Sequence, residues 1–141
     1  SLHDALPIYE APCPLCILQR YALLFIAIFA FIGAAMPGRR STTVFEGLTV
    51  LSAIGGIVAA GRHVYILANP NESCGLDVLQ PIVDGLPLAS WFPLGFQVDG
   101  FCTTPYPPIL GLSLAQWALA AFVLTVILVP LGIMRNRRTV R

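Results

Sequence analysis

The segment Pro12-Cys13-Pro14-Leu15-Cys16-Ile17-Leu18-Gln19-Arg20 places a Cys-x-x-Cys pair at the start of a strongly apolar run. Pro14 suits the first turn of an α-helix, where its missing N–H costs nothing. Both sulfurs then lie in that first turn, where the helix dipole favours a thiolate. Arg20 follows Cys16 by four residues and therefore shares its helix face. We expect a reactive dithiol with a cation one helical turn away.

Apolar residues make up 57% of the 141-residue chain, charged residues make up only 11%, and lysine is absent. A soluble globular protein carries about 25% charged residues, so most of this surface is not expected to face water. We therefore expect a single-domain, all-α integral membrane protein in contact with lipid. The sequence has neither a basic stripe nor an interleaved basic–aromatic run, so nucleic acid is not an expected partner.

Three segments are apolar and long enough to cross a bilayer, at about 17–36, 44–67 and 110–134. About 20 helical residues cross a ~30 Å hydrocarbon core. The first two segments are joined by a short basic turn, Arg39-Arg40-Ser41-Thr42-Thr43, whose hydroxyl residues are expected to cap the second helix. Small residues at four-residue intervals favour close helix contact in lipid, and the second segment has such a row at Ser52, Gly56 and Ala60.

Residues 69–108 form a long, proline-rich loop that contains the other two cysteines, Cys74 and Cys102. Within this loop, residues 86–92 are expected to form a short interfacial helix. Its apolar face, which would lie on the bilayer surface, consists of Leu88, Trp91 and Phe92. The alternative is an ordinary turn that packs in a small loop core.

Charge divides unevenly between the connections. Six of the eight arginines lie in the basic turn or the C-terminal tail: Arg39, Arg40, Arg135, Arg137, Arg138 and Arg141. Six of the seven acids lie at the other end of the spans: Asp4, Glu10, Glu72, Asp77, Asp84 and Asp99. By the positive-inside rule the turn and tail are cytoplasmic, and all four cysteines face outside. Three spans also place the N-terminus outside, so we expect a further upstream span that completes an antiparallel four-helix bundle, and we assign no structure to residues 1–8.

The spacing of the cysteines argues against a zinc site, and no metal is expected. Cys13 and Cys16 form one knuckle, but Cys74 and Cys102 are far apart and form no second one. Covalent c-type haem attachment is excluded because no histidine follows Cys16. Four cysteines outside the membrane fit an oxidising compartment, where disulfides persist.

Structural disulfides are the alternative to redox chemistry. A bridge between Cys74 and Cys102 would close a long loop and stabilise by a few kcal/mol. A Cys13–Cys16 bridge closes so short a loop that stability is a poor reason for it. Arg20 also favours redox chemistry, because an arginine just inside a span is costly and by default suggests function. Snorkelling to the interface is the alternative.

These features together resemble the bacterial disulfide bond formation protein B (DsbB) family. The shared features are a Cys-x-x-Cys-x-x-x-Arg motif at the outer end of a helix, a basic turn, a helix rich in small residues, a long outer loop with a distant cysteine pair, and Trp117 early in the last helix. The likeness covers roughly residues 11–134. The family's first helix precedes the Cys-x-x-Cys loop, and we expect an N-terminally truncated member because this sequence lacks it.

The resemblance implies an electron relay. DsbB-like proteins reoxidise a soluble thioredoxin-fold dithiol oxidase, DsbA, and pass the electrons to a membrane quinone, which keeps the periplasm oxidising. By position, the partner's thiolate attacks Cys74, the released Cys102 attacks Cys13, and Cys16 becomes the thiolate that faces the quinone. Arg20, together with Cys16, is implied to bind the quinone (ubiquinone or menaquinone) by stabilising negative charge.

The implied location is the bacterial inner membrane, with the cysteines periplasmic and the C-terminus cytoplasmic. Two alternatives remain. Proteins similar to vitamin K epoxide reductase also combine loop cysteines with a Cys-x-x-Cys, but there the motif follows the loop pair. A non-enzymatic membrane subunit with structural disulfides is the other. His63 is interpreted as a satisfied interfacial histidine, with proton transfer to the quinone as its alternative role.

Overall fold

The computed structural model describes residues 12–72, 76–103 and 107–139. In these ranges the chain is helical, with one isolated β-bridge between Ile109 and Leu112 and no strand. The helices are α1 (Pro14–Ala35), α2 (Arg39–Ala68), α3 (Leu76–Asp84), α4 (Pro87–Trp91), α5 (Pro93–Phe96) and α6 (Leu114–Thr139). Three stretches are long and apolar enough to cross a membrane: Pro14–Ala35, Arg39–Ala68 and Leu114–Arg135. The expected all-α protein with three membrane-spanning helices is confirmed.

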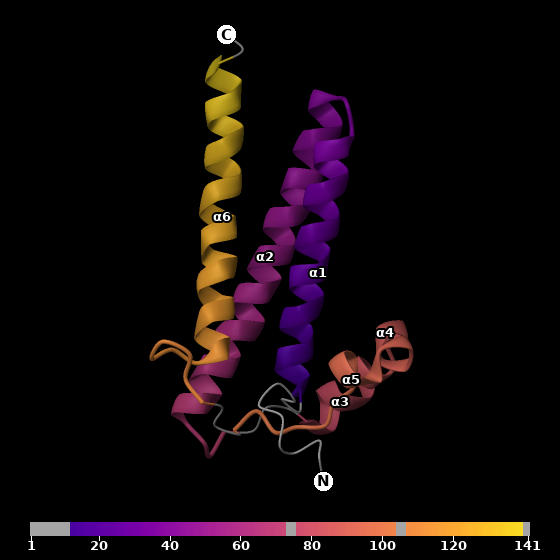
Figure 1. Cartoon of the computed structure of the whole chain (residues 1–141), viewed down its shortest axis with the longest axis vertical. Coiled ribbons are helices and arrows are strands. Elements are labelled where there is room, and N and C mark those ends of the chain that lie inside the picture. The colour runs from indigo at the N-terminus through magenta and orange to yellow at the C-terminus, as the bar shows by residue number, and fades with distance from the viewer. Residues whose placement is uncertain (1–11, 73–75, 104–106, 140–141) are drawn as a thin grey trace.

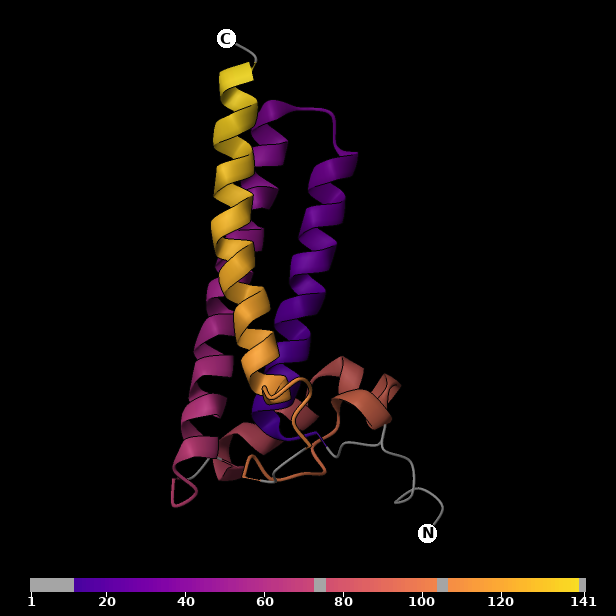
Figure 2. The same cartoon turned by 60° about the vertical axis from the view of Figure 1, so that its left-hand side comes forward.

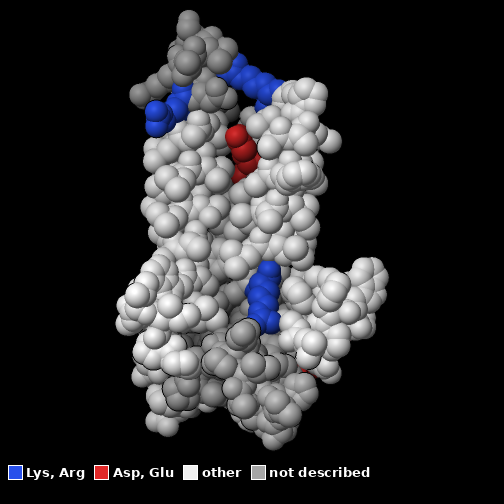
Figure 3. All heavy atoms as spheres, viewed as in Figure 1, with Lys and Arg blue, Asp and Glu red and all other residues white. Residues whose placement is uncertain are grey.

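The three long helices lie side by side, and the short ones gather at one end (Figures 1 and 2). Helix α2 is the central element because it packs against both α1 and α6. Helices α3, α4 and α5 lie beside the N-terminal end of α1, while the C-terminus lies at the opposite end (Figure 1). Away from the two ends, the face in Figure 3 carries few charged side chains, as expected for helices that contact lipid.

The basic turn is shorter than expected. Helix α2 begins at Arg39, with Gly38 as its N-cap, so the prediction that the hydroxyl residues cap this helix is wrong. The hydroxyls of Thr42 and Thr43 instead donate hydrogen bonds to the carbonyls of Gly38 and Arg39, each at 2.9 Å. Such back-bonding to the i−4 carbonyl keeps a hydroxyl side chain inside a helix rather than at its cap.

Helix α6 begins later than the expected start at about residue 110. Leu110 and Gly111 have φ values of +54° and +83°, which a right-handed helix cannot accommodate. Ser113 and Gln116 then form a capping box, since the Ser113 N–H donates to the Gln116 side chain at 2.8 Å and the Gln116 N–H donates to Ser113 Oγ at 3.3 Å. This box defines the N-terminus of α6.

A glycine allows α2 and α6 to pack closely. A Cβ atom added to Gly56 would lie only 2.4 Å from Cε1 of Phe122, a fully buried side chain of α6. Thr49, Ala53 and Ala60 are also buried on α2. The small residues of this helix therefore do bring another helix close, as lipid-embedded packing requires.

The loop between α2 and α6 docks onto the beginning of α1. Ile17 of α1 packs in a buried cluster with Val83 and Val98 of the loop. The backbone N–H groups of Asp99 and Gly100 both donate to the carbonyl of Pro12, at 3.1 and 3.2 Å. The backbone just before the Cys-x-x-Cys pair is thereby hydrogen-bonded to the loop.

Candidate functional site

The site is built around the N-terminal turn of α1. Cys13 is the N-cap residue, Pro14 is in the first turn, and the Cys13 sulfur accepts a hydrogen bond from the Cys16 N–H at 3.3 Å. The two sulfurs lie 2.7 Å apart, so a small approach would bring them to the ~2.0 Å of a disulfide. Both cysteines are free thiols. The local sequence thus produces a dithiol that is poised to close.

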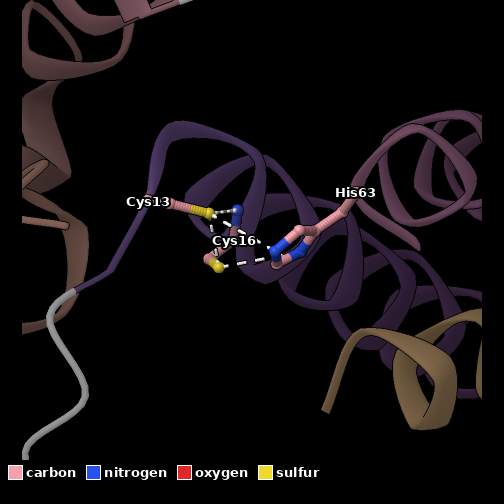
Figure 4. A group of neighbouring side chains, drawn as sticks. All are labelled: Cys13, Cys16 and His63. Carbon is pink, nitrogen blue, oxygen red and sulfur yellow. Dashed lines mark hydrogen bonds between the residues drawn. The ribbon is translucent and has the colours of Figure 1, made fainter. Parts of the chain in front are cut away.

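Helix α2 contributes a histidine to this dithiol. The imidazole of His63 faces both sulfurs (Figure 4), with Nε2 3.9 Å from Sγ of Cys13 and Nδ1 3.8 Å from Sγ of Cys16. His63 is only 4% exposed, and its Nδ1 lies 3.2 Å from the side-chain nitrogen of Gln19, which is also buried. A basic ring is therefore placed where protons must leave and return as the dithiol opens and closes.

The pKa of the Cys13 thiol is raised above its usual range. The main cause is its hydrogen bond with the Cys16 sulfur, and burial adds to the effect. Cys13 is fully buried, in a cluster with Leu15, Ile66 and Cys102. Cys13 therefore keeps its proton more readily than an ordinary cysteine does.

Arg20 connects α1 to the short loop helices. Its guanidinium donates a hydrogen bond to the carbonyl of Gly95 in α5. The next residue, Tyr21, makes an edge-to-face aromatic contact with Phe96, with ring centroids 5.1 Å apart. The Arg20 side chain is thus held by the loop helix α5 and does not extend into bulk water.

A cavity of about 710 Å³ opens beside the dithiol. Its polar lining residues are Cys16, Gln19, Arg20, His63, Ser113 and Gln116. Its apolar lining comes from all three long helices and includes Leu23, Val64, Leu67, Leu114, Trp117 and Ala118. The lining therefore combines reactive and polar side chains with apolar surface that suits an apolar ring or chain.

The second cysteine pair is described at Cys102 alone. Cys102 is disulfide-bonded and 1% exposed, and it packs in the same buried cluster as Cys13. Cys74 lies outside the described residues. The structure therefore brings Cys102 of one predicted pair and Cys13 of the other into the same buried cluster, although they are far apart in sequence.

Comparison with known proteins decides the family. The profile described as "Disulfide bond formation protein DsbB" matches residues 8–132. The chain belongs to the DsbB family. Disulfide bond formation protein B 1 of Pseudomonas putida is 79% identical over 98% of this chain and 82% of its own length. The protein of the same name from Pseudomonas syringae is 78% identical over the same shares, and a Burkholderia pseudomallei relative is 52% identical over 94% of this chain and 78% of its own length. No solved structure matches the chain.

Family membership makes the chain a membrane disulfide oxidoreductase, as its sequence predicted. The alternatives of a reductase similar to vitamin K epoxide reductase and of a non-enzymatic subunit with structural disulfides are set aside by the match to DsbB.

Gln19 is the residue of this candidate site that sequence reasoning missed, whereas His63 was named with proton transfer to the quinone as its alternative role. His63 was expected as an interfacial side chain, whereas the structure buries it against the dithiol. One signal was available, because two antiparallel helices joined by a short turn bring the end of α2 next to the start of α1. The helix register that aligns His63 with the sulfurs is a property of packing and leaves no local pattern.

Proposed function

We propose that this DsbB chain takes electrons from a periplasmic, DsbA-like thioredoxin-fold dithiol oxidase at a Cys74–Cys102 disulfide. It passes them through Cys13 and Cys16 to a membrane quinone. The observation that supports this best is the shared buried cluster of Cys13 and Cys102, since thiol–disulfide exchange needs sulfurs that can reach one another. That Cys102 is disulfide-bonded while Cys13 and Cys16 are free supports the division into two pairs.

The exchange consists of four attacks of a thiolate on a disulfide, and each attack forms one S–S bond and breaks another. The partner's thiolate attacks Cys74, the Cys74–Cys102 bond breaks, and Cys102 leaves as a thiolate. Cys102 then attacks Cys13 of the Cys13–Cys16 disulfide, and Cys16 leaves. The partner's second thiolate attacks the mixed disulfide and releases Cys74, which attacks Cys102 and frees Cys13. Two electrons have then moved from the partner to the Cys13–Cys16 pair, which is left as a dithiol.

At the end of the relay, Cys13 holds a proton and His63 is placed to accept it. The raised pKa of Cys13 favours its protonated form once it is released. Cys16 lines the cavity, so its sulfur is the one that faces an acceptor there. His63, in contact with both sulfurs, is placed to take the proton of Cys13 when the disulfide closes again.

The cavity residues fit a quinone. Its apolar walls suit the ring and the start of an isoprenoid tail, while Arg20, Gln19 and His63 offer N–H groups for two carbonyl oxygens. A bound quinone supplies an acceptor of two electrons and two protons. Arg20 contributes a fixed positive charge beside Cys16, and its hydrogen bond to Gly95 orients it.

Replacing Arg20 with methionine is expected to slow reoxidation of the Cys13–Cys16 dithiol by soluble quinone by about 10²-fold, the usual cost of removing a charge-stabilising donor. The first step, attack of the partner at Cys74, should keep its rate. Stopped-flow measurement of each half-reaction separates the two. Arg62→Met is the matched control because Arg62 lies at the same end of the bundle, half exposed, 3.8 Å from Glu72. Equal effects of the two changes would contradict the assignment.

Thiol trapping tests the relay itself. A DsbA-like partner that lacks its second active-site cysteine cannot resolve the mixed disulfide, so an adduct with the oxidised chain should accumulate. The adduct should map to Cys74, disappear in Cys74→Ser, and persist in Cys13→Ser, which is not needed for the first attack. Non-reducing electrophoresis and mass spectrometry provide the readout. An adduct at Cys13 or Cys16, or none at all, overturns the proposed order.

The proposed orientation places the cysteine end in the periplasm and the basic C-terminal end in the cytoplasm, within the bacterial inner membrane. The apolar side chains around α4 and α5 support contact with the outer bilayer surface, since Trp91, Phe92 and Leu94 are 73%, 62% and 75% exposed. A fourth helix would complete the bundle that the family resemblance implies, against exposed apolar side chains of α1 such as Phe25 and Phe31.

Trp91→Ala is expected to slow turnover several-fold in lipid vesicles, because the loop loses its largest apolar contact with the membrane surface. Stability should change little, since the side chain is mostly exposed. Limited proteolysis of the loop in vesicles should become faster. Ser90→Ala is the neighbouring control, because that hydroxyl is exposed and donates to the Pro87 carbonyl of its own helix. If Trp91→Ala matches the wild type in turnover and in proteolysis rate, α4 does not act through contact with the membrane surface.

A further inference from the structure

Cys13, Cys16 and His63 form a compact set of soft metal ligands. Their three ligand atoms lie within 4.8 Å of one another, and they come from two different helices (Figure 4). Cys13 and His63 are buried and Cys16 is half-buried. Thiolate and imidazole are the ligands that Zn²⁺ and related thiophilic cations prefer.

The distances are close to those of a bound ion. With metal–sulfur bonds of ~2.3 Å and metal–nitrogen bonds of ~2.0 Å, tetrahedral angles put two sulfurs about 3.8 Å apart and a sulfur and a nitrogen about 3.5 Å apart. Here Nε2 of His63 lies 3.9 Å from Sγ of Cys13, and Nδ1 lies 3.8 Å from Sγ of Cys16. One ring nitrogen lies within 4.8 Å of both sulfurs, and the sulfurs are 2.7 Å apart. The geometry is complete when the sulfurs move about 1 Å further apart and the imidazole turns so that one nitrogen faces both of them, movements that side-chain rotation allows.

Gln19 supplies the support that a ligating histidine usually has. Such a histidine donates its second ring N–H to a nearby acceptor, which fixes the tautomer and the ring orientation. The buried Gln19 amide lies 3.2 Å from Nδ1 of His63. Because an amide presents either its oxygen or its nitrogen, it can accept from Nδ1–H while Nε2 binds the ion.

We propose that the reduced Cys13–Cys16 pair and His63 together bind a thiophilic d¹⁰ cation of the Zn²⁺ and Cd²⁺ class. On binding, each thiol loses a proton to solvent and no electron moves. The fourth coordination position faces the cavity and is open to water. A Cys13–Cys16 disulfide has no thiolate to offer, so the oxidised chain does not bind the ion, and the site exists in one redox state alone.

Binding of the cation does not depend on the proposed electron relay, whereas the inhibition that we expect from it rests on that relay. A cation held by both sulfurs must leave before they can join, so it blocks reoxidation by the quinone and acts as an inhibitor. The spacing of the four cysteines argued against zinc, but it took no account of a histidine 47 residues after Cys16. Packing of α2 against α1 adds this third ligand.

Cadmium titration tests the site without partner or quinone. The full chain carries Cys74→Ser and Cys102→Ser, so that only Cys13 and Cys16 respond, and it is reduced with a phosphine in detergent. The sulfur-to-cadmium charge-transfer absorbance should saturate at one ion per chain, both thiols should stop reacting with an aromatic disulfide reagent, and Zn²⁺ should compete. The disulfide form should give no signal. Absence of binding, or binding equal to that of the denatured chain, overturns the proposal.

The role of the histidine has its own variants. His63→Ala is expected to weaken Cd²⁺ binding at least about 10-fold, since loss of even an outer-shell partner costs 10–100-fold. Asn69→Ala, at the C-cap of the same helix, should bind as the parent does. In case His63→Ala disturbs the fold, ¹¹³Cd NMR of the chain with its native His63 should show coupling to a histidine nitrogen. If His63→Ala binds Cd²⁺ with unchanged affinity, or if the ¹¹³Cd signal shows no coupling to nitrogen, the ion is bound by the two thiols without the histidine. Either result overturns the proposal.

Discussion

Replacing Cys16 with serine is expected to lower the rate of partner reoxidation by at least about 10³-fold, because loss of an essential reactive side chain removes nearly all catalysis. The Cys13–Cys16 disulfide could not form, so electrons from the loop pair could not pass to the quinone. The Cys16 sulfur is also the one that lines the cavity, so the serine hydroxyl would face any acceptor there. Turnover with reduced partner and excess quinone measures the loss.

The same substitution separates a redox role from a structural one. If the Cys13–Cys16 pair only stabilised the fold, Cys16→Ser would lower the unfolding temperature and leave turnover proportional to the folded fraction. A bridge across so short a loop stabilises little, so we expect the unfolding temperature to change by only a few degrees. Ser90→Ala, in the exposed helix α4, should keep wild-type turnover. Retained turnover in Cys16→Ser would rule out the relay through this pair.

Gly56→Ala is expected to destabilise the protein by about 1–3 kcal/mol, the usual cost of overpacking. The new Cβ would lie 2.4 Å from Cε1 of Phe122 and 2.6 Å from two other atoms of the same ring. Phe122 is fully buried, so relief requires α6 to move away from α2. Because His63 on α2 and Trp117 on α6 both line the cavity, the cavity should also widen. Thermal or detergent-induced unfolding, followed by circular dichroism, gives the stability.

Two glycines of the same helix provide matched controls. A Cβ atom at Gly55 or Gly61 meets no atom within 4 Å. Alanine at these positions should be neutral or should stabilise by up to about 1 kcal/mol, because alanine has the higher helix propensity. The contrast between neighbours Gly55 and Gly56 isolates packing from propensity. Equal stabilities of Gly55→Ala and Gly56→Ala would show that α2 and α6 are not closely packed at this point.

The spans and the reactive motif could be predicted from the sequence because each depends on neighbouring residues. A run of apolar residues predicts a membrane helix wherever it occurs, and Cys13, Pro14 and Cys16 define one helical turn. The ends of the helices were less predictable. Helix α2 begins at Arg39 because threonine hydroxyls bond inside the helix, and α6 begins at Leu114 because Leu110 and Gly111 adopt left-handed backbone conformations.

By itself, the sequence determined an all-helical membrane protein, a dithiol at the first turn of a span, a second cysteine pair in a long loop, and the resemblance to DsbB. Tertiary structure alone decided what surrounds the dithiol. It placed His63 against both sulfurs, Cys102 in the cluster of Cys13, and the Gly95 carbonyl on Arg20. The physical reason is that helix formation depends on residues that are close together in the sequence. The register between α1, α2 and the loop instead depends on side-chain packing between segments far apart in the chain.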